Sequence, residues 1–412
     1  MRPLIGRVQH YAWGSTDAIP HILGLTPDGA PWAEYWLGAH TSAPSVLDTG
    51  SGTASGITGQ GTDLDEYLAF HSEEIGDASC RAFGERLPYL VKILSAAHSL
   101  SLQAHPSRAQ AEAGFIAENA AGVPVNAADR LFRDDWPKPE MIVALTGFEA
   151  LSGFRDPAES LRLIGGLGVT PRVDEMLRPL RERDARSGLA TVIRDCLIGS
   201  EQVIVALADL LDAARRNLGR QDAVGDAAET AVELQADHPG DPSILAALLM
   251  NRVLLNPGQQ IHQPAGTMHA YLRGTGIEIM ANSDNVLRGG LTVKHVDVDA
   301  LLQVADLEPR RVIPSDPEPI GDAISLYRTP YPEFRLWRVE PGDRPVALPG
   351  ADRGRILLVI SGELECSTPS DRSAPARELA VGAGRSAWLA AGEAVSVRAG
   401  EPTLAFLAAP GV

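Results

Sequence analysis

The sequence is poor in cysteine and has no long apolar run. Its 412 residues include three cysteines, widely spaced and without a Cys-x-x-Cys pair, so neither a disulfide framework nor a thiolate zinc site is indicated. No stretch of about 20 apolar residues occurs, so no membrane-spanning helix is expected. The first residues lead into polar sequence without the apolar core of a signal peptide. We therefore expect a cytoplasmic protein with reduced, buried thiols.

Basic residues are outnumbered by acidic ones. There are 36 lysines and arginines against 53 aspartates and glutamates, which gives a net charge of −17. Such a field repels nucleic acids and anionic membranes, and no run of basic residues offsets it, so neither is expected as a partner. No Walker loop, and no Gly-x-Gly-x-x-Gly followed by the expected acidic residue, indicates a nucleotide. An anionic small molecule would need a local cluster of cations.

The length and the changing texture of the chain indicate two or three domains. Short apolar runs bounded by turn residues, such as Leu87–Leu94 and Met141–Leu145, are typical of β-strands. From 156 to 251, apolar residues instead recur at three- and four-residue spacing, as amphipathic helices require. Short strands then continue to the C-terminus, which is typical of a sandwich or barrel. The simplest partition is two β units with a helical block inserted in the first.

Residues 99–106 alternate apolar and polar side chains, which predicts a strand. Ser101, Gln103 and His105 then share one face. On a sheet curled into a barrel, Gln103 and His105 would present an oxygen and a nitrogen to a common point, as two metal ligands require. On an open sheet the same face would be solvated, and this segment alone does not decide between the two.

Lys138 and Glu140 form a second candidate pair. Prolines on both sides of Lys138 fix an extended backbone, and the two-residue spacing turns both side chains to one face. A carboxylate ligand beside a cationic substrate-binding group is the functional interpretation, and a solvated loop is the alternative.

The segment 260–282 is the richest in candidate ligands. A Pro-Ala-Gly turn leads into a strand on which His269 and Tyr271 alternate, an arrangement that resembles the second metal motif of cupin barrels. We predict a further turn at 273–276 and then a second strand, which carries Glu278 on the face opposite its isoleucines.

Together these motifs resemble the signatures of type I phosphomannose isomerases. The family's order is kept by VQHYAWGS, AEYWLGAHTSAPS, PYLVKILSAAHSLSLQAHPS, KPEM and the run from PAGTMHAYL through GTGIEIMANSDNVLRGGLTVKHVD. The similarity is dense over 1–155 and 251–305. The resemblance implies an isomerase that interconverts mannose 6-phosphate and fructose 6-phosphate and holds one Zn²⁺ per chain. It implies four zinc ligands, which are Gln103, His105, Glu140 and His269.

The same resemblance implies the fold and the substrate pocket. The chain should be mainly β with an inserted α-helical domain and two cupin-like jelly-roll β-barrel units. The expected domains are a zinc-binding catalytic cupin domain from 1–155 and 252–325, a helical insertion domain from 156–251 and a C-terminal cupin-like β domain from 326–412. Arg288 is implied as an active-site residue. The sugar phosphate pocket is implied to be lined by Lys92, Ser101, Lys138, Tyr271, Glu278 and Lys294.

Moving a proton between C1 and C2 of a sugar through a cis-enediol needs a base and an electrophile. Glu278 is the first candidate for the base, provided that burial raises its pKa, and Lys138 is the second. Arg288 is always cationic, which suits the stabilisation of an anion. The phosphate would meet Lys92, Ser101 and Lys294. The family usually has Asn-His before Lys-Pro-Glu, where this chain has Trp136 and Pro137. That histidine has been considered for opening the sugar ring or for proton transfer. Its absence means either that another group does this or that the protein is slow or altered.

Three other functions compete with this hypothesis. An isomerase of another aldose, or of an unphosphorylated sugar, would share the zinc motif and differ in the phosphate-binding cations. A second alternative is a zinc cupin that binds or senses a sugar phosphate without turnover. Its best support is Pro137, which stands where the family usually has the histidine. A metal-dependent dioxygenase is less well supported, because Gln and Glu ligands suit zinc and non-redox chemistry. We expect a monomer, and an oligomer stays open.

Overall fold

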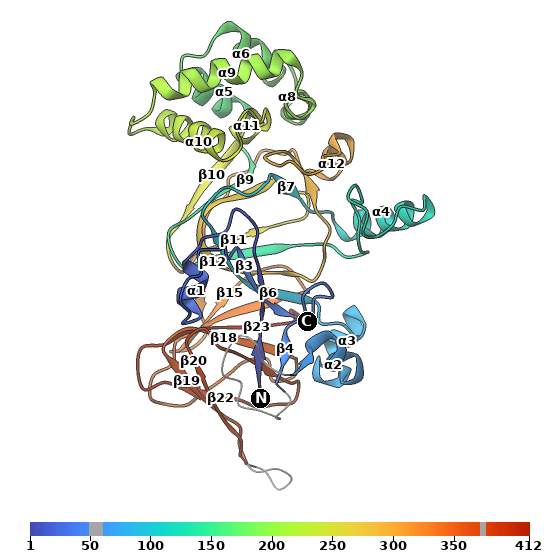
Figure 1. The fold of residues 1–412 in the computed structure, drawn as a ribbon, viewed down its shortest axis with the longest axis vertical. Coiled ribbons are helices and arrows are strands. Elements are labelled where there is room, and N and C mark those ends of the chain that lie inside the picture. The colour runs from blue at the N-terminus through green and yellow to red at the C-terminus, as the bar shows by residue number, and fades with distance from the viewer. Residues whose placement is uncertain (49–60, 371–375) are drawn as a thin grey trace.

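The computed structural model describes residues 1–48, 61–370 and 376–412, in which antiparallel sheets lie outside one helical block (Figure 1). The sheet that carries the candidate residues has ten strands within this part of the chain. Its strands are β2 (Arg7–Gln9), β3 (Glu34–Gly38), β6 (Tyr89–Ala96), β7 (Gln103–Ala104), β8 (Glu140–Ala144), β9 (Phe148–Phe154), β10 (Met250–Leu255), β11 (Gln260–Gln263), β12 (His269–Ala281) and β13 (Leu287–Arg288).

Two further sheets hold the remaining strands of the described residues. A nine-stranded sheet contains β1 (Arg2–Ile5), β4 (Val46–Leu47), β5 (Thr62–Asp63), β14 (Glu318–Pro319), β15 (Ile324–Tyr327), β16 (Arg335–Val339), β18 (Arg355–Ser361), β21 (Ser386–Leu389) and β23 (Leu404–Ala409). A four-stranded sheet contains β17 (Val346–Ala347), β19 (Glu363–Ser367), β20 (Glu378–Gly382) and β22 (Ser396–Arg398). The N-terminal strand β1 pairs with β21, so the first residues of the chain complete a sheet built mainly from its last quarter.

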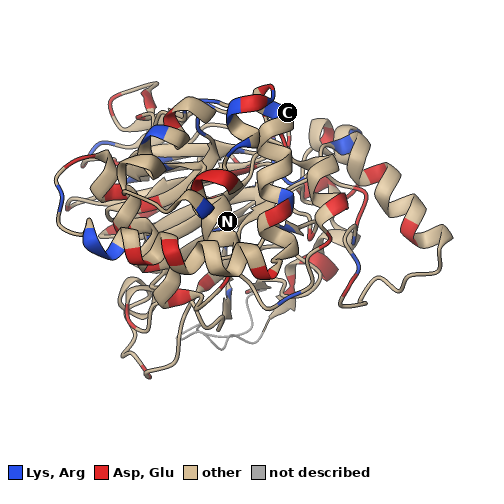
Figure 2. Cartoon of the chain, turned by 90° about the horizontal axis from the view of Figure 1, so that it is seen from above, with Lys and Arg blue, Asp and Glu red and all other residues tan. Residues whose placement is uncertain are grey.

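The helical spacing of the sequence corresponds to a block of consecutive helices at one end of the molecule (Figure 1). These are α5 (Pro157–Gly166), α6 (Pro171–Met176), α7 (Pro179–Glu182), α8 (Ala185–Ile198), α9 (Glu201–Arg216), α10 (Ala223–Asp237) and α11 (Ser243–Ala247). Asp156 begins α5 by accepting a hydrogen bond from the Ala158 N–H, with Pro157 in the first turn. The apolar stripe of α9 is buried, as its spacing predicts. Acidic and basic residues are interspersed on the helices that face the viewer in Figure 2.

The other helices are short or lie at the edges of the sheets. They are α1 (Ala18–Ile22), α2 (Leu64–Phe70), α3 (Asp77–Phe83), α4 (Arg108–Ala120) and α12 (Val298–Val304), with a 3-10 turn at Ser72–Glu74. Helix α4 begins with a capping box between Ser107 and Gln110. No helix in the described ranges is both long and apolar enough to cross a membrane.

The pleat of the ten-stranded sheet separates its core from its site. One face packs into the main β core, where Tyr35, Val91 and Ile279 lie with Leu358 and Phe406 of the nine-stranded sheet. Alternate residues point to the opposite face. On that face Trp36 pairs with Lys92 across β3 and β6, Lys92 pairs with Glu278 across β6 and β12, and Met280 pairs with Glu140 across β12 and β8. Directly opposed residues share a face, so these polar side chains converge over one surface of the sheet.

The turn predicted at 273–276 is wrong, because β12 runs through this segment without a break. The strand changes partners instead, pairing with β9 before Gly274 and with β8 and β6 after it. Gly274 has a φ of +119°, and a Cβ there would lie 2.6 Å from the carbonyl oxygen of Gly147. The glycine therefore serves a close strand crossing, not a reversal of the chain. His269 and Glu278 consequently stand on one strand.

The strand pairings of the described residues close no barrel. The prediction of β-sheets with a helical block between them agrees with the structure, in which helix and strand take nearly equal shares of the described residues, and the prediction of jelly-roll barrels is not confirmed by it.

Leu254 and Leu255 of β10 provide a matched test of the core, since they are 67% and 2% exposed. We expect Leu255→Ala to lower the free energy of unfolding by about 2–5 kcal/mol, because it leaves a cavity. Leu254→Ala should change it by less than about 0.5 kcal/mol. Denaturant titration of both variants measures the difference, and equal effects would contradict the assigned register of β10.

Candidate metal centre

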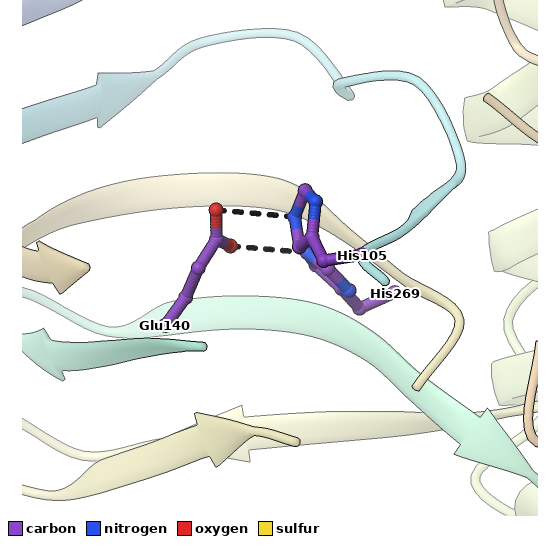
Figure 3. Close-up of side chains that lie close together, drawn as sticks. All are labelled: His105, Glu140 and His269. Atoms are coloured by element: carbon purple, nitrogen blue, oxygen red, sulfur yellow. Dashed lines mark hydrogen bonds and ion pairs between the residues drawn. The ribbon is translucent and has the colours of Figure 1, made fainter. Parts of the chain in front are cut away.

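Three buried side chains from distant parts of the chain meet at one point of the ten-stranded sheet. His105 follows β7, Glu140 begins β8 and His269 begins β12. Nε2 of His105 lies 3.1 Å from Oε1 of Glu140, and Nε2 of His269 lies 3.2 Å from its Oε2. Both imidazoles approach the carboxylate from the same side (Figure 3). The donor atoms of all three lie within 4.8 Å of one another, close enough to share one metal ion.

Backbone carbonyls orient both imidazoles. Nδ1 of His105 lies 2.8 Å from the carbonyl oxygen of Asn285, and Nδ1 of His269 lies 2.9 Å from that of Thr267. Since a carbonyl only accepts, each Nδ1 carries the proton and donates it. In the neutral ring each Nε2 is then an unprotonated lone pair aimed at the carboxylate.

The two Nε2 lone pairs and the Glu140 oxygens are all hydrogen-bond acceptors, so a cation between them would suit all three groups. Burial lowers the pKa of His105 to about 4, so its ring is neutral at pH 7. Its Nε2 is buried and has no hydrogen-bond donor among the described residues. Burial alone would raise the pKa of Glu140, but nearby cationic charge holds it well below its usual value, and Lys138, whose Nζ lies 3.5 Å away, supplies such a charge. Two imidazole nitrogens and a carboxylate oxygen form a donor set suited to a divalent metal.

Gln103 stands in register with this cluster. It pairs with His269 on one side and with Arg288 on the other, and His269 pairs in turn with Ser152. Opposed residues of antiparallel strands share a face, so Gln103, His269 and Arg288 form a row across β12, β7 and β13. Gln103 is half-buried.

A second polar cluster lies on the same sheet beside the triad. Nζ of Lys92 lies 2.8 Å from Oε2 of Glu278 and 3.4 Å from Oε1 of Glu34. Burial, together with Glu140 and Glu34, raises the pKa of Glu278 despite the opposing effect of Lys92. The condition that sequence reasoning set for a base at Glu278 is therefore met. The Tyr271 hydroxyl is fully buried, and no group in the described residues lies in hydrogen-bonding geometry with it. Burial, and after it the nearby carboxylates of Glu278 and Glu140, raise its pKa well above its usual value.

The cationic residues differ in how they are paired. Lys92 lies between two carboxylates and is 6% exposed, which leaves it little capacity for a phosphate. Arg288 is half-buried and Lys294 is exposed. Burial lowers the pKa of both, and the charged groups that lower it further are other cations, Arg133 among them. Ser101 is half-buried near the start of β7.

Sequence reasoning missed several residues of the site. Glu34 is a second ion-pair partner of Lys92. Arg133 joins Arg288 and Lys294 in a cationic cluster. The backbone carbonyls of Asn285 and Thr267 orient the imidazoles. Alternation in the segment AEYWLGAHTSAPS would have placed Glu34 on a face with a tryptophan, which is a usable signal. No side-chain pattern announces a backbone carbonyl.

Trp136 and Pro137, which stand where the family usually has Asn-His, are both buried. The Trp136 ring lies 5.7 Å from that of Phe83, with the Arg86 guanidinium 4.4 Å from its centre. Trp136 thus packs in an aromatic and cationic layer, and Pro137 offers no side-chain donor or acceptor.

A cavity of about 940 Å³ lies away from the triad between the helical block and β10. Its polar lining mixes both charges, with Arg155, Arg252 and Arg310 against Glu149, Glu159 and Asp226. Volume alone does not mark a reactive site, so the buried triad and not this cavity is the candidate functional centre.

The fold and the site define a β-rich protein with a buried histidine–carboxylate metal centre. A model of the catalytic domain of type I phosphomannose isomerase matches residues 1–157. The chain is 34% identical to mannose-6-phosphate isomerase of Shigella flexneri over 95% of each chain, and 29% identical to that of Homo sapiens over 97% and 96%.

Solved structures agree with this comparison. A mutant of phosphomannose isomerase from Salmonella typhimurium superimposes with a TM-score of 0.86 at 30% identity, covering 100% of both chains. A mannose 6-phosphate isomerase bound with zinc and yttrium gives 0.84 at 30% identity, covering 100% of this chain and 99% of that one. The chain belongs to the type I phosphomannose isomerase family and is an isomerase. The resemblance seen in the motifs is thereby confirmed.

Removing either imidazole should remove the metal. We expect the purified protein to bind about one zinc ion per chain, and His105→Ala or His269→Ala to lose most of it, because each removes one of few ligands. His98→Ala is the control, since the His98 side chain is 62% exposed and pairs with Asp237. Metal analysis after dialysis measures the content. Full zinc in both ligand variants would refute the assignment.

Proposed function

We propose that the chain is a zinc-dependent aldose–ketose isomerase that interconverts mannose 6-phosphate and fructose 6-phosphate through a cis-enediol intermediate. The observation that carries the proposal is the buried triad of His105, Glu140 and His269, whose lone pairs converge as a metal requires. The relatives are named as mannose-6-phosphate isomerases, which supports this choice of substrate. The paired Lys92 and Glu278 beside the triad, and the unpaired cations beyond it, supply the other groups that the reaction needs.

The metal would be held by Gln103, His105, Glu140 and His269, one ion per chain. When bound, zinc supplies Lewis-acid polarisation of the sugar oxygens at C1 and C2 without redox chemistry. Gln103 enters this set because it opposes His269 in the sheet. Burial excludes water around the triad, which strengthens every electrostatic interaction there.

Glu278 is our choice for the base that moves the proton between C1 and C2. Its raised pKa brings the carboxylate closer to the working pH, where proton transfer is most efficient. Lys92 holds that carboxylate in place at 2.8 Å and stays protonated, since Glu278 and Glu34 raise its pKa against the effect of burial. Lys138, beside Glu140, is the second candidate. Tyr271 lines the same pocket and offers its buried hydroxyl to the sugar.

The phosphate would bind Lys294, with Ser101 and the cations Arg133 and Arg288 nearby. These cations repel one another, and an anion relieves that repulsion. Sequence reasoning assigned the phosphate to Lys92 as well, and we now propose that Lys92 serves Glu278, because two carboxylates already neutralise it. Arg288 is the group closest in register to the ligands, so it also stabilises negative charge on the reacting oxygens.

For the fold we propose two cupin-like jelly-roll units that are open at their edges. The domains would be 1–155 with 252–325, the helical insertion 156–251 and the C-terminal unit 326–412. The continuous helices from α5 to α11 support the insertion. The pairing of β1 with β21 means that the first and last units share a sheet, so we expect them to unfold together.

A coupled assay with mannose 6-phosphate, before and after chelation, tests the activity. We expect turnover with zinc loaded, loss after chelation and recovery when zinc is restored. Two control substrates are used. Free mannose lacks the phosphate, and glucose 6-phosphate has the opposite configuration at C2. Binding of mannose 6-phosphate without turnover in the zinc-loaded protein would favour the sensor, and turnover of mannose alone would favour another isomerase.

Arg288 and Lys294 should respond differently to truncation. Arg288→Ala should lower kcat by about two to three orders of magnitude, because a donor to a developing oxyanion is lost. Lys294→Ala should mainly raise KM, because it binds the phosphate equally in ground and transition states. Arg311→Ala, at an exposed arginine, is the control for charge. Steady-state kinetics with zinc content measured in parallel distinguishes the two, and an unchanged kcat in Arg288→Ala would refute its role.

A further inference from the structure

His40 is a buried imidazole that the proposed mechanism does not use. It follows β3, whose residues Glu34 and Trp36 lie on the site face of the sheet. The residue is 4% exposed, and its ring meets the Trp36 ring edge-on at 4.8 Å. Trp36 in turn donates its Nε1–H to Glu34, the partner of Lys92. His40 is therefore continuous with the polar cluster beside the metal ligands.

The contacts of His40 determine which nitrogen carries the proton. The backbone N–H of Ser42 lies 3.3 Å from Nδ1, and the Ser42 hydroxyl lies 2.8 Å from it. A backbone N–H only donates, so Nδ1 accepts and the proton of the neutral ring is on Nε2. Nε2 lies 3.4 Å from Oδ1 of Asp284, a long contact of the kind that tightens when a substrate binds.

Asp284 lies beside Asn285, in the loop that orients His105. Its side chain is 44% exposed, while its backbone N–H donates to Oδ2 of Asp134 at 2.7 Å. The next residue, Asn285, provides the carbonyl that orients His105. Burial raises the pKa of Asp284, but His40, Lys138 and Arg133 outweigh it and lower that pKa. The loop thus presents a charged carboxylate that interacts with Lys138, the neighbour of Glu140, and with Arg133, the neighbour of Arg288 and Lys294.

We propose that His40 is a positioning residue that holds the Asp284 carboxylate for a sugar hydroxyl. The Nε2–H of His40 fixes Oδ1, and Oδ2 is left to accept a hydrogen bond from a hydroxyl of the sugar phosphate at the metal centre. Ser42 makes this device specific, because it reserves Nδ1 as an acceptor and keeps the donor on the Asp284 side. The inference rests on the proposed sugar phosphate substrate and adds a contact that the metal ligands do not supply.

Two amide substitutions of His40 test separately the hydrogen bond made at Nε2 and the one made at Nδ1. The amide nitrogen of His40→Gln reaches the place of Nε2, whereas that of His40→Asn reaches only the place of Nδ1. We expect His40→Asn to lower kcat/KM about tenfold, as loss of a hydrogen bond to a charged group does, and His40→Gln to recover most of it. Equal losses in the two variants would mean that His40 only packs, and would overturn the proposal.

A double-mutant cycle with Asp284→Asn tests whether His40 acts through Asp284. We expect His40→Asn to cause little additional loss of kcat/KM in the Asp284→Asn background. Fully additive losses would overturn the proposal. If the wild type binds mannose 6-phosphate without turning it over, the isomerase function fails, and the same cycle measured as binding affinity by calorimetry still decides the role of His40. Absence of binding as well as turnover overturns both.

Nitrogen NMR of the histidine rings gives a readout that does not depend on activity. We expect the His40 signals of the zinc-loaded wild type to show an unprotonated Nδ1 and a proton on Nε2, and the Nε2 resonance to move in Asp284→Asn. A ring protonated at Nδ1, or an Nε2 resonance that ignores Asp284, would overturn the proposal.

Discussion

The site depends on one electrostatic conflict, in which two imidazole lone pairs point at a carboxylate inside the protein. The carbonyls of Asn285 and Thr267 create it, because each takes the Nδ1 proton and leaves Nε2 bare. Glu140 stays ionised because nearby cationic charge, that of Lys138 included, lowers its pKa against the effect of burial. A cation between the three groups turns repulsion into attraction, so we expect metal binding to stabilise this part of the fold.

The backbone that imposes this geometry is shared with the core. Strand β12 carries His269 and Glu278 on its site face and Ile277 and Ile279 on its core face, so a register slip of one residue would exchange them. The loop around Asn285 is held by its own side chain, which donates to the carbonyls of Asp134 and Trp136. Trp136 is itself packed in an aromatic layer. Hydrophobic packing thus fixes the positions of groups that would otherwise repel one another.

Local patterns in the sequence singled out the candidate ligands, the family resemblance named them as a set, and long-range pairing decided the rest. His105, Glu140 and His269 could be found because each lies in a short motif, and the helical block because its spacing differs from its surroundings. The strand through Gly274 was missed, because a glycine needed for close packing has the same local signature as a turn. The double pairing of Lys92 was missed because Glu34 and Glu278 lie 58 and 186 residues away along the chain. The tautomers were beyond prediction, since carbonyl acceptors leave no trace in residue types.

Pairing of charges, more than their number, determines where an anionic substrate can lie. At a net charge of −17 the protein as a whole repels a sugar phosphate, so the local balance must favour it. A phosphate beside Lys92 would meet two carboxylates, and each like charge at 4 Å is unfavourable by about 4 kcal/mol at an effective dielectric constant of 20. Beside Arg288 and Lys294 the neighbouring charges are cations, and the sign reverses. The row from Arg288 through Gln103 to His269 then gives the proposed substrate a direction, with its reacting carbons along this row and its phosphate beyond it at Lys294. The acidic surface and the selective cationic end of the site are thus compatible, because the lysine buried deepest is the one already neutralised.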